Sequence, residues 1–155
     1  MTKQIGILIV SLCLFLASSS HAQSIDWRQT QLSIDDHHLV ADIAATARER
    51  GHGLMYRESM SDEEGMIFIF DRPDRHCFWM RNTLIPLSIA FLDAQGRILQ
   101  INDMQPESEE LHCANRPASY ALEVNQGWFA ERGIRPGMTS VVRADRPLSE
   151  LAATP

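Results

Sequence analysis

Polar side chains that could take part in binding or catalysis lie within an otherwise apolar stretch at residues 78–87 (FWMRNTLIPL). Arg81, Asn82 and Thr83 stand among large apolar residues, where a plain core strand would carry more valine and isoleucine. A polar group inside a protein must find hydrogen-bond partners, because an unsatisfied one costs about 1–3 kcal/mol. This stretch is therefore where we expect a binding site first.

A second group of residues that could take part in chemistry is a duplicated pair, His76-Cys77 and His112-Cys113. Two histidines and two cysteines make a ligand set for zinc or copper. Neighbouring residues on a strand point to opposite faces, however, so one strand seldom presents both members of such a pair to one metal. The cysteines can also form a disulfide or stay as free thiols. We predict the disulfide between Cys77 and Cys113, and metal binding through the pairs stays an alternative.

The first 22 residues have the organisation of a cleaved signal peptide. Lys3 gives a positive start, residues 5–17 form an apolar run, and small residues precede the expected cleavage before Gln23. This run is shorter than the roughly 20 residues that span a bilayer, and an uncleaved anchor is the alternative. We expect a periplasmic or secreted protein without a membrane span after cleavage. Because Cys13 leaves with the signal, two cysteines remain.

The charge balance excludes some functions. Lys3 is the only lysine, so the mature chain has 13 arginines against 20 acidic residues and a net charge of about −7. No lysine remains for Schiff-base or amine catalysis. An acidic chain without a visible basic stripe is a poor nucleic-acid binder. We expect no nucleic-acid partner and no cofactor, and the sequence points to no particular protein partner.

The hydrophobic pattern predicts an α+β fold: a compact single domain with a mostly antiparallel β-sheet of about seven short strands and two short helices. The continuous apolar run at 66–70 is typical of a central strand. Alternation within 119–124 places Tyr120, Leu122 and Val124 on one face, with Ala121 and Glu123 on the other. The other expected strands are at 31–34, 39–45, 76–82, 87–93, 98–104 and 138–143.

Turn and capping signals complete this outline. Thr46 and Glu49 have the spacing of a capping box that opens a helix at 47–57. Asn125 is expected to cap a second, short helix through Trp128 and Phe129. A turn is expected at 71–74, and Asp42 is expected to face outward from its strand.

The domain organisation that follows is a signal peptide at 1–22, an N-terminal arm and first strand at 23–37, a domain at 38–143 and a flexible tail at 144–155.

Several motifs in this order resemble the domain of unknown function 192 (DUF192) family, over about residues 38–143. The family implies a small, β-rich α+β fold for an often exported protein, and it brings no established activity. After Pro86-Leu87 the family commonly has an acidic residue, whereas this chain has Ser88. The motifs are 53–57 (GLMYR), 65–70 (GMIFIF), 78–83 (FWMRNT), 86–87 (PL) and 122–123 (LE).

The family pattern falls on four residues that we interpret as a shared binding pocket: Arg57, Trp79, Asn82 and Glu123. Arg57 would offer a planar fork to a carboxylate or to sugar hydroxyls, and Asn82 would offer both donors and acceptors. Trp79 would supply an aromatic wall, and Glu123 a carboxylate. The expected partner is a small polar, carbohydrate-like ligand, which would make the chain an exported ligand-binding or accessory domain. The structural alternative is a buried ion pair between Arg57 and Glu123, with Asn82 satisfying a strand end.

A hydrolase that uses Glu123 is a further alternative. Glycoside hydrolysis needs two carboxylates about 5–9 Å apart. Asp42, Asp93 and Asp103 are candidates for the second, and the sequence does not place any of them beside Glu123. Because no nucleophile elbow, His-Glu-x-x-His motif or phosphate loop is present, we expect a binding domain rather than an enzyme.

Overall fold

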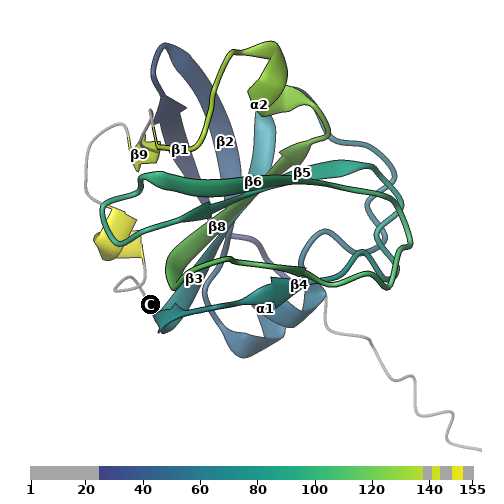
Figure 1. Cartoon of the computed structure of the whole chain (residues 1–155). Coiled ribbons are helices and arrows are strands. Elements are labelled where there is room, and N and C mark those ends of the chain that lie inside the picture. Colours follow the sequence, from purple (N-terminus) through teal and green to yellow (C-terminus); the bar gives the residue numbers. More distant parts are fainter. Residues whose placement is uncertain (1–24, 138–140, 144–147, 152–155) are drawn as a thin grey trace, which may run out of the picture.

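The structure, a computed structural model, describes residues 25–137, 141–143 and 148–151 (Figure 1). Its strands form a seven-stranded mixed sheet and a separate two-stranded ribbon. The sheet has the order β6-β5-β8-β3-β2-β1-β9 and consists of β1 (Gln29–Ile34), β2 (His37–Ala44), β3 (Glu64–Asp74), β5 (Leu87–Leu92), β6 (Ile98–Met104), β8 (Ala118–Asn125) and β9 (Val141–Arg143). The remaining elements are the ribbon strands β4 (Cys77–Phe78) and β7 (His112–Cys113), the helices α1 (Ala47–His52) and α2 (Trp128–Glu131), and a 3₁₀ turn, η1 (Leu148–Leu151).

Helix α1 belongs to the connection between β2 and β3, the parallel pair of the described sheet. Parallel neighbours need a crossover connection, which α1 and the loop at 53–63 supply. The predicted capping box is confirmed: the Glu49 amide donates to Thr46 Oγ1 (3.2 Å), and the Thr46 amide donates to the Glu49 carboxylate (2.8 Å). The helix ends at Gly53, whose φ is 50°, so it is shorter than the predicted 47–57.

The sheet is buried on both faces, which gives the domain two apolar clusters. On β8, Tyr120, Leu122 and Val124 pack into one cluster and Ala121 into the other, so the predicted alternation is confirmed. All six residues of β5 are buried, as expected for a strand covered on both sides. The first cluster lies toward α2 and η1, and the second toward the ribbon and the loops around it.

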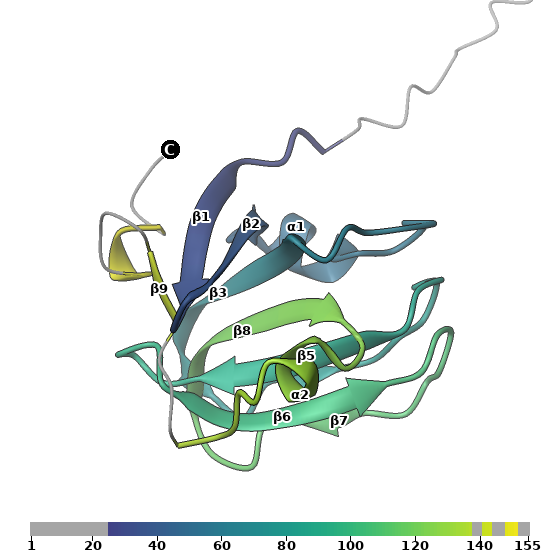
Figure 2. The same cartoon turned by 90° about the horizontal axis from the view of Figure 1, so that it is seen from above.

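The sheet bends strongly along its width. Figure 2 shows β1, β2 and β3 together on one side and β5, β6 and β8 on the other. The bend brings β9 to the turn between β5 and β6, where the Val141 amide donates to the Gly96 carbonyl (2.8 Å). A Cβ atom at Gly96 would lie 2.3 Å from the Val141 carbonyl oxygen, so this approach requires glycine. In the described ranges, no helix is both long enough and apolar enough to cross a membrane.

The C-terminal elements differ from the expectation in two details. Gly127, not Asn125, is the N-cap residue of α2, because the Asn125 side chain instead donates to the Met60 carbonyl (2.9 Å). Within the predicted flexible tail, Leu148 and Leu151 are buried in η1. These two leucines give that part of the tail an apolar attachment to the core.

The predicted turn at 71–74 and the predicted strand at 76–82 are both wrong. Strand β3 continues through Asp74, and β4 has only two residues. The chain then turns at 80–83, where the Thr83 amide donates to the Met80 carbonyl (3.0 Å) and Asn82 has a φ of 58°. Asparagine adopts this left-handed conformation more readily than most residues, and a regular strand does not pass through it. The polar stretch that drew attention in the sequence is therefore a loop.

Candidate functional site

A cavity of about 570 Å³ lies on the face of the sheet that packs toward the ribbon. Its lining comes from α1 and the loop after it, from β3, from β4 and the loop after it, and from Glu123 of β8. The volume is within the range of roughly 300–1,000 Å³ that is usual for small-molecule sites. The cavity therefore offers room for a ligand, and Glu123 is the residue of β8 that lines it.

Glu123 provides a carboxyl group at the buried end of this cavity. The residue is 4% exposed, and within the described part of the chain its carboxyl group makes no hydrogen bond or ion pair. Burial raises the pKa of Glu123 to about 8, because removal from water penalises the charged form. The group is thus mostly protonated at pH 7 and is able to donate a hydrogen bond, which an ionised carboxylate cannot.

Aromatic rings form much of the cavity wall. Phe68 and Phe78 meet edge to face with ring centroids 4.9 Å apart, and Phe70 stacks on His76 with centroids 3.5 Å apart. Trp79 also lines the cavity and is 45% exposed, so its ring is accessible from solvent. A ligand in this cavity would meet aromatic faces on the way to one buried carboxyl group.

The rim of the cavity carries charged residues that are paired with one another. Arg50 contacts the Asp71 carboxylate (3.1 Å) and donates to the Ile69 carbonyl (2.9 Å). Arg72 lies 3.8 Å from the Asp74 carboxylate, and both side chains are exposed. The rim guanidinium groups therefore have partners of their own, and neither neutralises Glu123.

Three loops are joined beside Trp79 by backbone hydrogen bonds. The Tyr56 amide donates to the Asn82 carbonyl (2.8 Å), and the Glu107 amide donates to the Thr83 carbonyl (3.0 Å). Tyr56, Asn82 and Glu107 all have positive φ values, of 64°, 58° and 57°. Such backbone strain costs on the order of 1–3 kcal/mol per residue and clusters at functional sites. Three of the four non-glycine residues with positive φ in the described structure thus lie beside the cavity, whereas the fourth, Asp35, lies in the turn between β1 and β2.

Two of the four predicted site residues share the cavity, and two do not line it. Trp79 and Glu123 line it together. Arg57 instead forms an ion pair with Asp42. The alternative of an ion pair between Arg57 and Glu123 is therefore wrong, as is the expectation that Asp42 faces outward, since Asp42 is buried. The pairing register explains this, because Met66 of β3 stands between Asp42 and Glu123.

Asn82 serves the turn rather than the cavity. Its side-chain amide lies 4.0 Å from the Met55 sulfur, and its backbone carbonyl holds the loop that contains Tyr56. The neighbouring Thr83 is buried and does line the cavity. Sequence reasoning also missed Phe68 as a residue of the site, although its place on the predicted central strand was the available signal.

Replacing Arg57 with alanine should lower the free energy of unfolding by about 2–3 kcal/mol without weakening binding in the cavity. The Asp42 side chain is 6% exposed and would lose its guanidinium partner, keeping the Gln29 amide at 2.9 Å. Breaking a fully buried pair costs about 3–5 kcal/mol, and the 27% exposure of Arg57 reduces this. Urea denaturation followed by circular dichroism measures the loss. An unchanged midpoint would show that Asp42 does not depend on this pair.

None of the three candidate partners for a hydrolytic Glu123 lines the cavity. Asp93 pairs with Arg97 (2.9 Å), and Asp103 accepts a hydrogen bond from Ser88 Oγ. Asp42 shares a sheet face with Glu123 but lies two strands away, about 10 Å at the usual strand spacing. The described geometry therefore does not supply the pair of carboxylates that glycoside hydrolysis requires.

Ser88, where the family commonly has an acid, lies away from Glu123. Its hydroxyl group donates to Asp103 and accepts from the Gly127 amide (2.9 Å). Ser88 pairs with Val124, whose side chain packs into the cluster on the other side of the sheet. The departure from the family pattern therefore leaves the cavity intact, and Asp103 supplies a carboxylate next to the altered position.

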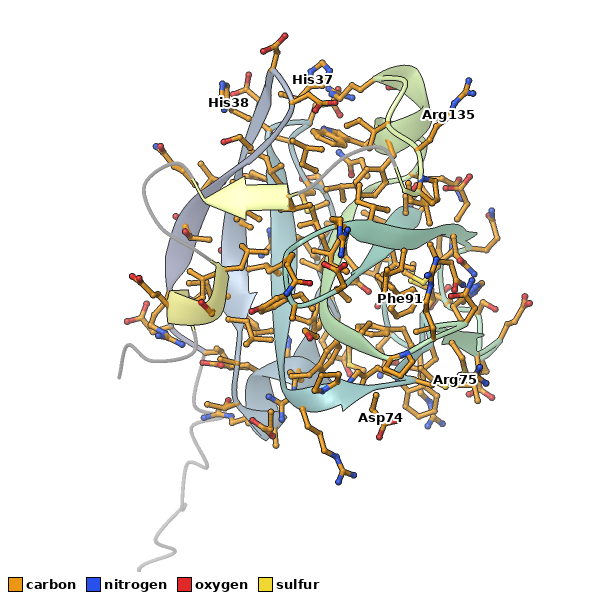
Figure 3. The ribbon with its side chains drawn as sticks, turned by 60° about the vertical axis from the view of Figure 1, so that its left-hand side comes forward. His37, His38, Asp74, Arg75, Phe91 and Arg135 are labelled. Carbon is orange, nitrogen blue, oxygen red and sulfur yellow. A yellow bond between two sulfur atoms is a disulfide. The ribbon has the colours of Figure 1, made fainter. Side chains whose placement is uncertain are left out.

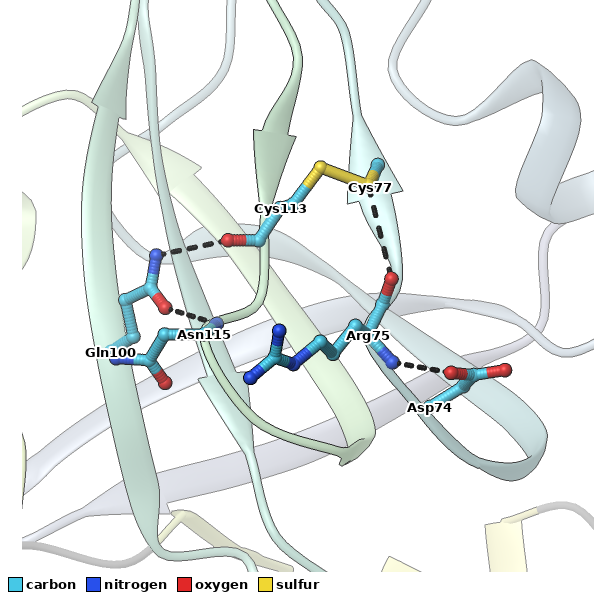
Figure 4. Close-up of a disulfide and its surroundings, with 6 residues drawn as sticks. All are labelled: Asp74, Arg75, Cys77, Gln100, Cys113 and Asn115. Atoms are coloured by element: carbon cyan, nitrogen blue, oxygen red, sulfur yellow. Dashed lines mark hydrogen bonds between the residues drawn. A yellow bond between two sulfur atoms is a disulfide. The ribbon is translucent and has the colours of Figure 1, made fainter.

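The two cysteines are bonded to each other. Cys77 and Cys113 face one another across the ribbon and form a disulfide, as predicted (Figure 4). Gln100 of β6 donates to the Cys113 carbonyl (3.2 Å) and accepts from the Asn115 amide (2.7 Å), which fastens the ribbon to the sheet. Because bonded sulfurs are not thiolates, the alternative of a metal held by both His-Cys pairs is not supported.

The remaining histidine pair is remote from the cavity. Figure 3 shows His37 and His38 at the opposite end of the molecule from Asp74. The ring of His37 lies edge-on to Trp128, with centroids 6.1 Å apart. Across the described ranges, no group of three or more His, Cys, Asp or Glu side chains is placed to hold a metal ion.

Comparison with solved structures gives two relatives. One is a protein from Sinorhizobium meliloti 1021, provisionally described as a transcription regulator: the identity is 29%, the TM-score is 0.75, and the match covers 79% of this chain and 98% of that one. The other is a protein of unknown function from Novosphingobium aromaticivorans DSM 12444: the identity is 37%, the TM-score is 0.66, and the match covers 74% of this chain and 84% of that one. No curated protein matches the chain.

The sequence pattern of DUF192, a family described as uncharacterized ACR, matches residues 30–142. These residues contain every strand of the sheet apart from the ends of β1 and β9, and they contain all residues that line the cavity. The resemblance seen in the sequence motifs is thereby confirmed. The chain belongs to the DUF192 family.

Proposed function

We propose that the chain is an exported ligand-binding domain, and that a small organic molecule occupies the cavity over Glu123. The observation that carries this proposal is a buried carboxyl group without a partner in the described structure, at the end of a cavity large enough for a ligand. An unsatisfied buried polar group normally costs about 1–3 kcal/mol, so its retention calls for a reason. A ligand that completes its hydrogen bonding provides that reason.

The two ends of the cavity indicate what the ligand must offer. It needs a polar group for Glu123, with Thr83 as a second buried polar neighbour, and it needs a flat or ring-shaped surface for Trp79. A carbohydrate-like ring meets both requirements, because its C–H face stacks on an aromatic ring. Export is the part of the proposal that depends on residues 1–22, which lie outside the described residues, and intact mass with the mature chain starting at Gln23 tests it.

Replacing Trp79 with alanine should reduce ligand occupancy at least tenfold while the fold survives. The ring is half-exposed, so its loss removes a wall of the cavity with little effect on the core. Native mass spectrometry of protein that has been incubated with an extract of small metabolites compares the bound organic mass in the two proteins. Leu111→Ala is the matched control, because Leu111 is 62% exposed on the neighbouring loop and does not line the cavity. Equal occupancy in Trp79→Ala, or a wild-type protein that retains nothing, contradicts the proposal.

A further inference from the structure

We infer that the group of the ligand that meets Glu123 is a protonated amine. This inference rests on the proposed function and specifies its ligand class. Three features of the cavity point to a cation: a buried carboxyl group without a partner among the described residues, walls that include aromatic side chains, and few other buried polar groups.

Among the described residues, none provides a counter-charge for Glu123. The described residues contain no lysine, and the two arginines on the cavity rim contact Asp71 and Asp74. Arg57, which does not line the cavity, pairs with Asp42. A carboxylate without a partner is costly in a buried site, whereas a bound ammonium group would supply both charge and hydrogen-bond donors.

The cavity walls favour a cation as well. Phe68, Phe78 and Trp79 line the cavity, and the face of an aromatic ring attracts a positive charge. The chain already uses this interaction at its surface, where Arg81 lies 5.3 Å from the centroid of the Trp79 ring. Desolvated cation–π contacts are stronger than exposed ones, so a buried amine would gain more than Arg81 does.

A neutral, hydroxyl-rich compound would find fewer partners at the buried end. Of the buried polar residues in the described chain, Thr83 and Glu123 line the cavity, whereas Thr30, Asp42 and Ser88 do not. Two side chains cannot satisfy many hydroxyl groups. One amine on a carbohydrate-like ring or on a short chain matches these two side chains better than many hydroxyl groups do, with the C–H or apolar part of the ligand against the aromatic side chains.

This inference predicts that binding releases a proton. A nearby cation stabilises the ionised carboxylate, so the pKa of Glu123 falls on binding and the proton passes to the buffer, while the amine keeps its own proton. With a pKa of about 8, some 0.9 of the Glu123 side chains are protonated at pH 7, and release of up to ~0.9 proton per ligand follows. A neutral hydrogen-bond acceptor would instead hold the proton in place.

The other titratable or charged groups around this cavity are Arg50 and His52 from α1, Asp71, Arg72 and Asp74 from β3, His76 before β4, and the Asp42–Arg57 pair beside β3.

The test is isothermal titration calorimetry at pH 7 with 2-phenylethylamine and its neutral counterpart 2-phenylethanol, each in phosphate and in Tris buffer. We expect the amine to bind at least tenfold more tightly than the alcohol, with proton release seen as a buffer-dependent enthalpy. Glu123→Gln should remove both this preference and the proton release. Glu110→Gln, the same change on an exposed loop residue, should behave like the wild type.

Each outcome separates this inference from the proposed function. If the alcohol binds as tightly as the amine, the cation inference fails and the binding function stands. If the amine binds more tightly without proton release, or keeps its preference in Glu123→Gln, it binds elsewhere and the inference also fails. If neither probe binds at millimolar concentration, the cation inference fails, and the occupancy experiment with Trp79→Ala then decides the proposed function.

Discussion

The free energy of unfolding of the wild-type protein should fall as the pH rises from about 4.5 to 8, and Glu123→Gln should lack this loss. Burial raises the pKa of Glu123 from 4.5 to about 8, so between these values the folded state holds a proton that the unfolded state has released. Stability then decreases with pH, because the unfolded state binds fewer protons. The difference between the two pKa values corresponds to on the order of 5 kcal/mol of unfolding free energy. The decrease in stability ends above pH 8, where Glu123 is ionised in both the folded and the unfolded state.

Urea denaturation of both proteins at pH 5, 6, 7, 8 and 9 measures this effect. The informative quantity is the difference between the two stabilities at each pH, since all other titrating groups contribute equally to both proteins. Glutamine keeps the size and neutrality of the protonated acid, so the two proteins should be nearly equal at pH 5, and the variant should be more stable at pH 8. A constant difference across the series would show that Glu123 ionises with an ordinary pKa and that its buried carboxyl group is not held neutral.

The fold was largely accessible from the sequence because its signals are local. The apolar run at 66–70 became part of β3, the alternation around Leu122 became the two faces of β8, and the capping box at Thr46 started α1. Errors arose where one residue overrides a pattern over several positions. The positive φ of Asn82 prevents the expected strand from reaching residue 82, and Gly53 caps the expected helix early.

The candidate site was only partly accessible, because it depends on which strands become neighbours. Family motifs indicated Trp79 and Glu123, and these line the same cavity. The same motifs suggested Arg57, but only the sheet order shows that Arg57 reaches Asp42 and that β3 separates this pair from Glu123. A propensity or a period along the chain carries no information about such long-range neighbours. The cavity itself is a property of the packing between α1, the ribbon and the sheet.

The site also shows how this domain divides stability between its parts. Glu123, which has no partner among the described residues, is held by the surrounding sheet, whose strands beside it are buried: β5, most of β8 and residues 65–69 of β3. The opposite wall pairs with no strand of this sheet and is joined to it through Gln100 and the aromatic contacts of Phe78. Strands β4 and β7 form only two residue pairs, Cys77 with Cys113 and Phe78 with His112, and the ribbon is a separate sheet. The wall that carries Phe78 and Trp79 therefore depends on a cross-link.

Removing that cross-link should have the second large effect. The variant with both Cys77→Ser and Cys113→Ser should lose about 3–4 kcal/mol of unfolding free energy, because the bond closes a loop with a sequence separation of 36 residues. Urea denaturation with and without reductant measures the loss: reductant should destabilise the wild type and leave the double variant unchanged. If reduced wild-type protein unfolds at the same urea concentration as oxidised protein, the bond adds nothing to the free energy of unfolding.

Reduction should also weaken binding of 2-phenylethylamine, because the ribbon holds Phe78 and the adjoining Trp79 against the cavity. This loss of binding should appear without urea, while the seven-stranded sheet remains folded.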